Sequence, residues 1–302
     1  MSNLKVNIAG VQFKNPIITA SGTFGFGKEY SEYYPLEKLG GMCTKGLTLN
    51  KRLGNPPPRI TEIAGGMMNS VGLQNPGVDY YLNNDDLRLA KEDVVVIANI
   101  AGSSLEDYVA MAEKIGQSKA QMVELNISCP NVKAGGMAFG VLPSSVEKIT
   151  RAVKNACSKP VITKLSPNVS CIADNAKAAE AGGADCISLI NTLSGMAVNY
   201  KTKRPVLANN NGGVSGACVK SVALKMVWDC FNAVKIPIIG MGGITCFEDV
   251  LEFLICGAQA VQVGTYNFGN PLGAMQIAEN LAKYVEENNI DINDIVGSLQ
   301  LN

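Results

Sequence analysis

The sequence predicts a single (β/α)8 barrel, and three observations support this fold class. Eight short runs of β-branched or apolar residues recur along the chain, and most precede a segment with helical periodicity. Such alternation of strands and helices indicates a parallel sheet. The length of 302 residues is close to that of one closed barrel, which typically has about 250 residues. We therefore expect residues 1–302 to form one domain, with an N-terminal extension before the first barrel strand.

The predicted elements follow one another in a regular order. The strands occupy residues 17–20, 42–45, 94–99, 122–126, 161–165, 186–190, 237–240 and 260–264. The helices occupy residues 104–117, 144–158, 172–181, 219–233, 247–256 and 272–287. Ser104 and Ser144 are expected to be N-caps, with Asp107 and Glu147 placed for capping-box contacts. The connection after the second strand, 46–91, contains Asn55-Pro56-Pro57-Pro58, which cannot be helical, and is predicted to be an insertion over the barrel mouth.

An open doubly wound sheet is the alternative architecture. It would place a dinucleotide-binding glycine fingerprint directly after the first strand, at the start of a helix. The run Gly22-Thr23-Phe24-Gly25-Phe26-Gly27 does not have that spacing. The closed barrel is therefore the better prediction.

Composition excludes several classes of function. The 26 basic and 26 acidic residues balance, so nothing indicates a nucleic-acid partner. No apolar run is long enough to span a bilayer and the first residues lack a long apolar core, so we expect a cytoplasmic protein. The nine cysteines are scattered and the chain has no histidine, so neither a disulfide framework nor a metal site is expected. Any redox chemistry would then need an organic cofactor.

Glycines at the last two strand ends indicate a phosphate site. In a barrel, residues just past the strand ends face one mouth, and loops seven and eight commonly hold a phosphate on backbone N–H groups. Gly242 and Gly243 follow the seventh strand, and Gly264 and Thr265 close the eighth. The segment 212–216 could add a third wall. Glycines also occur in simple turns after strands, but their occurrence after both the seventh and the eighth strand favours a phosphate site.

Two lysines close predicted strands in runs too apolar for a solvated face. Lys45 ends the second strand and Lys164 lies near the end of the fifth. An interior lysine needs a partner or a task. It could donate to an electron-rich ring that becomes negative on reduction, or form a Schiff base as in barrel aldolases. The spacing of the residues leaves both open.

Three amides and a thiol are also expected near the mouth. Asn69, Asn126 and Asn191 would suit a small planar substrate with C=O and N–H groups. Cys129 lies in Asn126-Ile127-Ser128-Cys129-Pro130-Asn131, where the fourth strand runs out. Without histidine, a general base must be Cys, Lys, Asp, Glu or Tyr, so this thiol is a candidate, although a free cysteine is usually a small apolar residue. The loop 132–139 could be a lid or a flexible linker.

Four further motifs can be read in the sequence, and together with the segments above they span nearly the whole chain. They are Ala20-Ser21-Gly22-Thr23-Phe24-Gly25, Thr44-Lys45-Gly46-Leu47-Thr48, Gly54-Asn55-Pro56-Pro57-Pro58-Arg59 and Asn69-Ser70-Val71-Gly72-Leu73-Gln74-Asn75. With the Cys129 motif and the two late glycine motifs, they resemble the dihydroorotate dehydrogenases of pyrimidine biosynthesis. The cysteine is similar to the base of the soluble class 1 enzymes, whereas the membrane-associated class uses serine and carries an N-terminal extension.

The resemblance implies a cofactor, a substrate and a reaction. FMN would lie in the barrel mouth, against Ser21, Lys45, Gly46, Asn99, Asn126, Lys164, Ile190, Gly216, Gly242, Gly243, Gly264 and Thr265. Dihydroorotate would contact Lys45, Asn69, Ser70, Val71, Gly72, Leu73, Asn126, Asn191 and Thr192. Cys129 would remove the C5 proton while the C6 hydride moves to flavin N5, which gives orotate. An ordinary thiol has a pKa of about 8.5, so activity should rise with pH through the neutral to alkaline range.

The resemblance also implies where the electrons go. Residues 4–10 and 22–30 look more like the NAD-linked class 1B type, whose partner subunits carry FAD and a [2Fe–2S] cluster and join a homodimer of the catalytic chain in a heterotetramer. The alternatives are a fumarate-dependent class 1A homodimer and a dihydropyrimidine-reducing relative. From other classes, a Schiff-base aldolase using Lys164 and a non-enzymatic scaffold remain.

Overall fold

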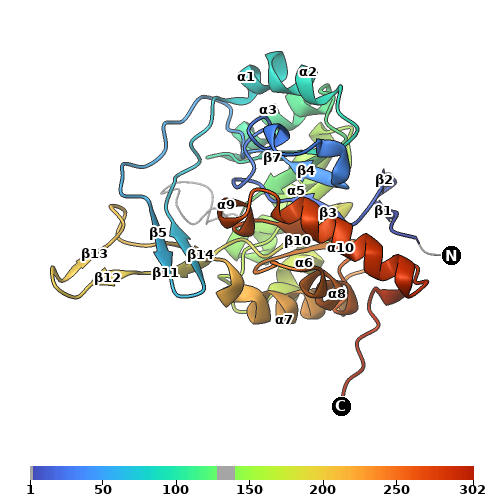
Figure 1. Cartoon of the computed structure of the whole chain (residues 1–302). Helices are drawn as coiled ribbons and strands as arrows, with labels where there is room; N and C mark the ends of the chain where they lie inside the picture. The colour runs from blue at the N-terminus through green and yellow to red at the C-terminus, as the bar shows by residue number, and fades with distance from the viewer. Residues whose placement is uncertain (1–2, 128–139) are drawn as a thin grey trace.

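Eight parallel strands close into a barrel in the computed structural model, which describes residues 3–127 and 140–302. Around the barrel they follow the order β3, β4, β7, β8, β9, β10, β15 and β16, which is also their order in the chain (Figure 1). Their bounds are Ile17–Thr19, Gly41–Cys43, Val95–Ile100, Met122–Asn126, Val161–Lys164, Cys186–Leu189, Ile238–Met241 and Ala260–Val263. The predicted barrel and its eight strands are confirmed.

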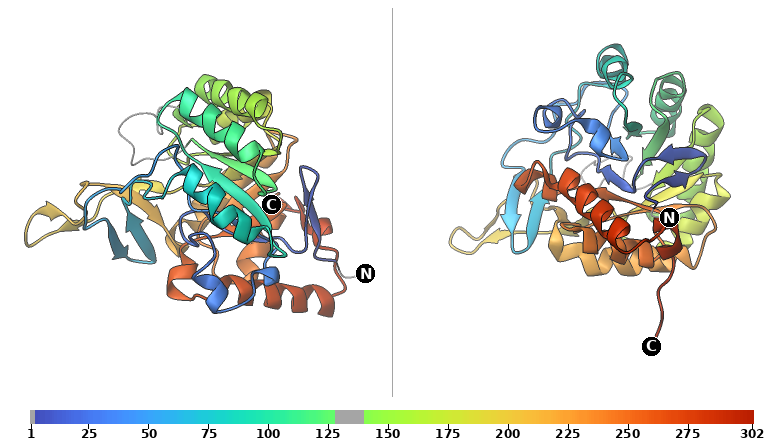
Figure 2. Two further views of the ribbon diagram at one scale, coloured as in Figure 1. Left: turned by 90° about the horizontal axis from the view of Figure 1, so that it is seen from above. Right: turned by 45° about the vertical axis from the view of Figure 1, so that its right-hand side comes forward.

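Helices pack around the outside of the barrel (Figure 2). They are α1 (Val78–Asn83), α2 (Asp85–Leu89), α3 (Leu105–Gly116), α5 (Pro143–Ala156), α6 (Ile172–Ala181), α7 (Lys220–Phe231), α8 (Phe247–Ile255), α9 (Tyr266–Gly269) and α10 (Gly273–Glu287). Short 3-10 turns are η1 (Tyr30–Glu32), η2 (Leu36–Lys38), η3 (Ala217–Val219) and η4 (Ile292–Ile295). No described helix combines the length and apolar character needed to cross a bilayer.

The predicted caps had different outcomes. Ser104 caps α3, where its hydroxyl accepts a hydrogen bond from the backbone N–H of Asp107 at 3.2 Å. The prediction for Ser144 was wrong, because α5 begins one residue earlier, at Pro143, and Leu142 occupies the N-cap position. Proline is favoured in the first helical turn, since its missing N–H would have no helical partner there.

The barrel strands are buried on both faces, as expected for parallel strands covered by helices. All five residues of β8 are buried, including the charged Glu124 and the polar Asn126. Side chains alternate across a strand, so these two polar residues share the face opposite Val123 and Leu125. The register pairs Asn126 with Lys164 of β9 and Glu124 with Asn99 of β7. The strands therefore bring polar groups into two successive layers of the barrel interior.

A second sheet lies beside the barrel. Its four antiparallel strands follow the order β11 (Leu193–Gly195), β14 (Gly212–Ser215), β6 (Gly66–Asn69) and β5 (Ile60–Ile63). The chain between β4 and β7 supplies β5, β6, α1 and α2, so two distant connections meet in this sheet. The hairpin of β12 (Val198–Asn199) and β13 (Arg204–Pro205) extends away from the barrel (Figures 1 and 2). Another hairpin, of β1 (Val6–Ile8) and β2 (Val11–Phe13), precedes the first barrel strand.

Candidate active site

A cavity of about 630 Å³ opens at the carboxyl ends of the barrel strands. Its size lies within the range of roughly 300–1,000 Å³ that is usual for small-molecule sites. Its walls come from the barrel strand ends and from the second sheet, because residues of β6 and β14 also line it. Two chain segments that are far apart in the sequence thus enclose one space.

One end of the cavity is a backbone cradle. Gly216, Gly242 and Gly243 have φ angles of 108°, 129° and 79°, which L side chains rarely adopt. A Cβ atom on Gly243 would lie 2.8 Å from the Cβ of Lys220 and 3.1 Å from the carbonyl oxygen of Gly216. Glycine therefore lets the loop after β15 press against the start of α7. Backbone N–H groups in such a loop can approach an anion closely.

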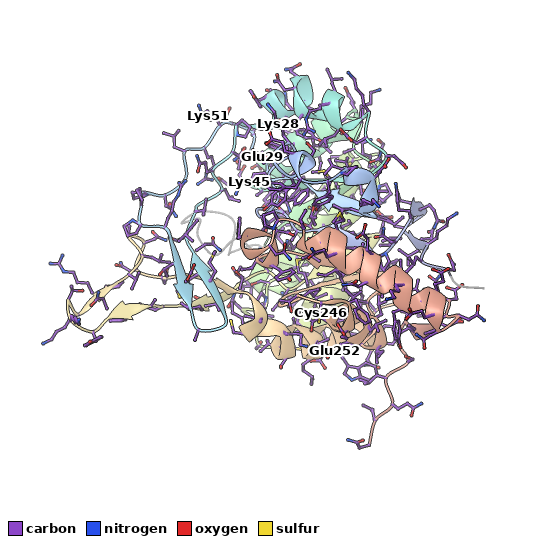
Figure 3. The ribbon with its side chains drawn as sticks, in the orientation of Figure 1. Lys28, Glu29, Lys45, Lys51, Cys246 and Glu252 are labelled. Carbon is purple, nitrogen blue, oxygen red and sulfur yellow. The ribbon has the colours of Figure 1, made fainter. Side chains whose placement is uncertain are left out.

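Asp249 fastens this cradle from the next helix. Its carboxylate accepts hydrogen bonds from Lys220 Nζ at 2.6 Å, from the Thr245 N–H at 2.7 Å and from the Cys246 N–H at 3.2 Å. Burial alone would raise the pKa of Asp249, but the bonds from Lys220 and Thr245 outweigh it and lower the pKa. Lys220 also pairs with Glu252 at 2.9 Å, one turn further along α8. Figure 3 labels Glu252 and Cys246, which flank Asp249 in the sequence. The loop is thus held between α7 and α8.

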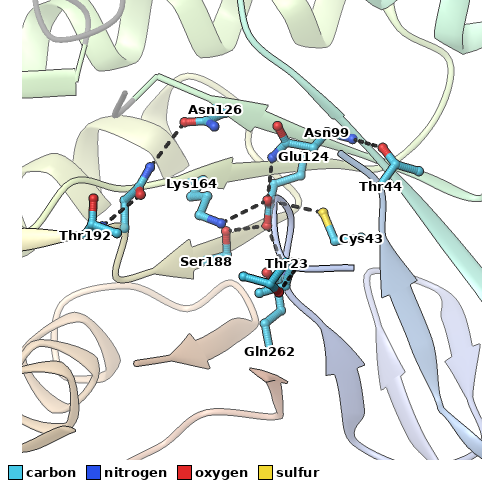
Figure 4. Close-up of polar contacts among 12 residues, drawn as sticks. Thr23, Cys43, Thr44, Asn99, Glu124, Asn126, Lys164, Ser188, Thr192 and Gln262 are labelled. Carbon is cyan, nitrogen blue, oxygen red and sulfur yellow. Dashed lines mark hydrogen bonds and ion pairs between the residues drawn. The ribbon is translucent and has the colours of Figure 1, made fainter. Parts of the chain in front are cut away.

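Amides and a lysine form the floor. Asn126 and Lys164 are almost fully buried and line the cavity. Asn191 donates from Nδ2 to Oδ1 of Asn126 at 3.4 Å, and its own Oδ1 accepts from the backbone N–H of Thr192 at 2.8 Å. Figure 4 shows this chain of contacts beside Lys164. These groups offer both donors and acceptors to a flat polar molecule.

Below the floor lies a fully buried carboxylate that the sequence analysis did not single out. Glu124 Oε1 is 3.4 Å from Lys164 Nζ, and Oε2 accepts hydrogen bonds from Ser188 Oγ and Gln262 Nε2. Burial alone would raise the pKa of Glu124, but the charge of Lys164 and hydrogen bonds from Gln262, Ser188 and Asn99 lower it. A signal was present in the sequence, because an acidic residue within an apolar strand needs a partner.

Comparison with known proteins identifies the family of this chain. The sequence profile of dihydroorotate dehydrogenase matches residues 3–285, nearly the whole chain.

The chain belongs to the dihydroorotate dehydrogenase family. It is 52% identical over 300 residues to the protein of Thermoanaerobacter pseudethanolicus named dihydroorotate dehydrogenase B (NAD(+)), catalytic subunit, with 99% of each chain covered. Proteins of the same name from Alkaliphilus metalliredigens and Bacteroides fragilis are 53% and 48% identical. Those matches cover 98% and 100% of this chain and 99% and 100% of the relatives.

Most residues that the dihydroorotate dehydrogenase resemblance assigned to a site line the cavity. Those assigned to the cofactor are Ser21, Lys45, Gly46, Asn126, Lys164, Ile190, Gly216, Gly242, Gly243, Gly264 and Thr265. Those assigned to the substrate are Lys45, Asn69, Val71, Gly72, Leu73, Asn126, Asn191 and Thr192. The structure thus gathers these residues around one space.

Asn99 and Ser70 are not among the described residues that line the cavity. β7 continues to Ile100 and pairs Asn99 with Glu124, so Asn99 lies one layer below the floor. There its Nδ2 donates to Glu124 Oε1 at 2.6 Å. Ser70 is fully buried between two lining residues, Asn69 and Val71, as the alternation of an extended chain requires.

The predicted base and lid lie outside the described residues. Cys129 and the loop 132–139 belong to the segment 128–139. Lining residues that the sequence analysis missed include Glu62 and Met67 of the second sheet, Thr245 near the cradle, and Gln262 of β16, whereas Ser215 belongs to the segment 212–216 that was expected to add a wall. The inward direction of Gln262 depends on how β16 sits in the closed barrel, so no local pattern marks it.

Proposed function

We propose that this chain is the catalytic subunit of a class 1B dihydroorotate dehydrogenase and oxidises dihydroorotate to orotate in pyrimidine biosynthesis. The observation that carries this proposal is the composition of the cavity at the strand ends, which has a glycine cradle at one end and a buried lysine among amides at the other. Relatives of about 50% identity over the full length carry the corresponding name. Residues 1–302 would act as one FMN-binding domain.

The residues of the cavity fit FMN. The loop of Gly242 and Gly243 suits a phosphate together with Gly264 and Thr265, which follow the neighbouring strand β16, because glycines let backbone N–H groups approach an anion closely. Gln262 Oε1 is a buried acceptor without a partner among the described residues, and Gln262 lines the cavity. A side-chain amide in the wall can present its donor or its acceptor to a polar ring. FMN, when bound, supplies the hydride-accepting chemistry.

The protein's own groups would bind, orient and move one proton. The Lys164 ammonium at the floor would stabilise negative charge that develops on a bound ring. Asn126 and Asn191, which are hydrogen-bonded to each other, would orient the C=O and N–H groups of a planar substrate. Cys129 would remove the C5 proton, and the loop 132–139 would close over the substrate to exclude water.

The electrons would leave through a partner subunit. The names of the relatives contain both "catalytic subunit" and NAD(+), which supports the NAD-linked assembly over fumarate reduction at the same site. We propose a cytoplasmic heterotetramer, in which a homodimer of this chain binds two electron-transfer subunits that carry FAD and a [2Fe–2S] cluster. The ion pair between Lys164 and Glu124 argues against the Schiff-base aldolase, because an ammonium is not a nucleophile.

A single preparation tests the proposal. The purified chain should be yellow, release FMN on acid treatment and convert dihydroorotate to orotate in preference to dihydrouracil to uracil. Cys129→Ala should retain FMN and lose turnover by about 10²-fold or more, the usual effect of removing a general base. Cys171→Ala, which removes an exposed thiol, is the matched control and should keep full turnover. A colourless protein, or full turnover of Cys129→Ala, would refute the assignment.

A further inference from the structure

The carboxylate of Glu124 is the centre of a hydrogen-bond hub inside the barrel. Five side chains from five other barrel strands donate to it or pair with it (Figure 4). Oε1 is 2.6 Å from Asn99 Nδ2, 3.3 Å from Cys43 Sγ and 3.4 Å from Lys164 Nζ. Oε2 is 2.9 Å from Ser188 Oγ and 2.7 Å from Gln262 Nε2. The carboxylate therefore occupies a fully enclosed site made of donors.

Lys164 differs from the other members of this hub because it carries a full charge. Its side chain is only 6% exposed, and that of Glu124 is 0% exposed. Lys164 lines the cavity, whereas Glu124 lies below the floor. A buried charge is strongly disfavoured unless a counter-charge and hydrogen bonds compensate it. The cavity-facing ammonium thus depends on a carboxylate that a bound molecule does not reach.

We propose that Glu124 is a positioning residue: its negative charge fixes the Lys164 ammonium at the cavity floor, where Lys164 binds FMN. This inference rests on the proposed function, since it takes FMN as the ligand. The competing explanation is that the hub only joins neighbouring strands. In that case the shape and hydrogen bonds of residue 124 would matter, and its charge would not.

Two substitutions separate charge from shape. Glu124→Gln keeps the shape, and its new N–H group has an acceptor available because Gln262 Oε1 is buried without a partner among the described residues. The Gln262 amide can turn over and the Ser188 hydroxyl can rotate, so the hydrogen bonds can be kept while the charge is lost. Glu124→Asp keeps the charge and loses one methylene group. The two variants therefore test opposite properties of the same position.

The experiment measures FMN affinity of the deflavinated chain by quenching of FMN fluorescence. Glu124→Gln should bind FMN at least about tenfold more weakly than the wild type, because Lys164 loses its counter-charge, and Glu124→Asp should stay within about threefold. Asp86→Asn is the control, since Asp86 is also a buried carboxylate but accepts from Tyr81 Oη and the Lys119 N–H in a different part of the fold. It should bind FMN normally. Weaker binding by Glu124→Asp than by Glu124→Gln would overturn the inference.

A double-mutant cycle tests whether Glu124 acts through Lys164. In a Lys164→Met background, Glu124→Gln should change FMN affinity by less than about twofold, because its effect requires the ammonium. An equal loss in both backgrounds would show a merely structural role and overturn the inference. If Glu124→Gln alone fails to fold, recovery of folding on adding Lys164→Met supports the pair, and a double variant that stays unfolded overturns it.

The outcomes also separate this inference from the proposed function. A wild-type chain that binds no FMN would overturn both. A wild-type chain that binds FMN, together with a Glu124→Gln variant of unchanged affinity, would overturn the role of Glu124 and leave the proposed function intact.

Discussion

Asp249→Asn should loosen the glycine cradle and destabilise the fold. The carboxylate is 2.6 Å from Lys220 Nζ, and its side chain is 7% exposed. An amide at this position can still accept from the Thr245 N–H, but it presents a donor to Lys220, so one charge-assisted hydrogen bond of about 1.5–3 kcal/mol is lost. Because Lys220 keeps its contact with Glu252, we expect a loss of about 2 kcal/mol.

This loss corresponds to a measurable shift in melting temperature. For 302 residues the entropy of unfolding is about 0.6 kcal/mol/K, so Tm should fall by about 3 °C. Asp229→Asn is the matched control, because Asp229 is also 2.6 Å from a lysine, Lys225, but both side chains are more exposed, at 39% and 69%. An exposed pair of this kind contributes about 0.5 kcal/mol or less. Differential scanning calorimetry of both variants compares the two.

The effect of Asp249→Asn should also depend on pH in one direction. The pKa of Asp249 is lower in the folded protein than its ordinary value of 3.8, so its stabilisation is fully present above about pH 4 and is lost as the pH falls through the folded pKa. The difference in free energy of unfolding between wild type and variant should therefore be constant from about pH 5 to 8 and shrink below about pH 4. Equal Tm losses in Asp249→Asn and Asp229→Asn, or a difference that grows in acid, would refute this reasoning.

Three further predictions concern single residues. Gly243→Ala should cost about 1–2 kcal/mol and weaken FMN binding, since φ is 79° and the new Cβ would lie 2.8 Å from Lys220. Gly116→Ala is the control in thermal melts and should not destabilise the fold, because Gly116 ends helix α3 and its nearest contact would be 3.6 Å. Tyr108→Phe removes a buried hydrogen bond of 2.7 Å to the Asn126 carbonyl and should lower urea stability by about 1 kcal/mol; an unchanged midpoint would contradict this. If Cys129 is the base, kcat/KM should rise with pH up to about 8.5. A flat profile with rate-limiting proton abstraction argues against a thiol.

Local patterns predicted the elements well because they reflect local physics. A buried parallel strand needs a short apolar run, so residues 122–126 were placed correctly as a strand without knowledge of its neighbours. The N-cap of α5 was predicted two residues too late, at Ser144 instead of Leu142, because the prediction followed the serine and did not consider Pro143 as the first helical residue. Both features are decided within a few residues. The proline that marks the observed start of α5 was therefore a local signal that the prediction left unused.

The site was predicted in part, and the limits have a physical cause. Gly242, Gly243, Gly264 and Thr265 could be placed at one end of the cavity because parallel strands all end at the same mouth. How deep a residue lies within the barrel is harder to predict from the sequence. Asn99 was expected at the mouth, yet β7 runs on to Ile100 and the register places Asn99 beside Glu124, one layer down.

The sequence by itself determined the barrel, the glycine end of the cavity and the family, since each depends on short motifs in a fixed order along the chain. Only the tertiary structure decided which polar groups meet inside. Glu124 and Gln262 are 138 residues apart, and their contact of 2.7 Å exists because closure of the sheet brings β8 and β16 to face each other across the interior. Closure fixes strand tilt and register together, and these are properties of the whole sheet.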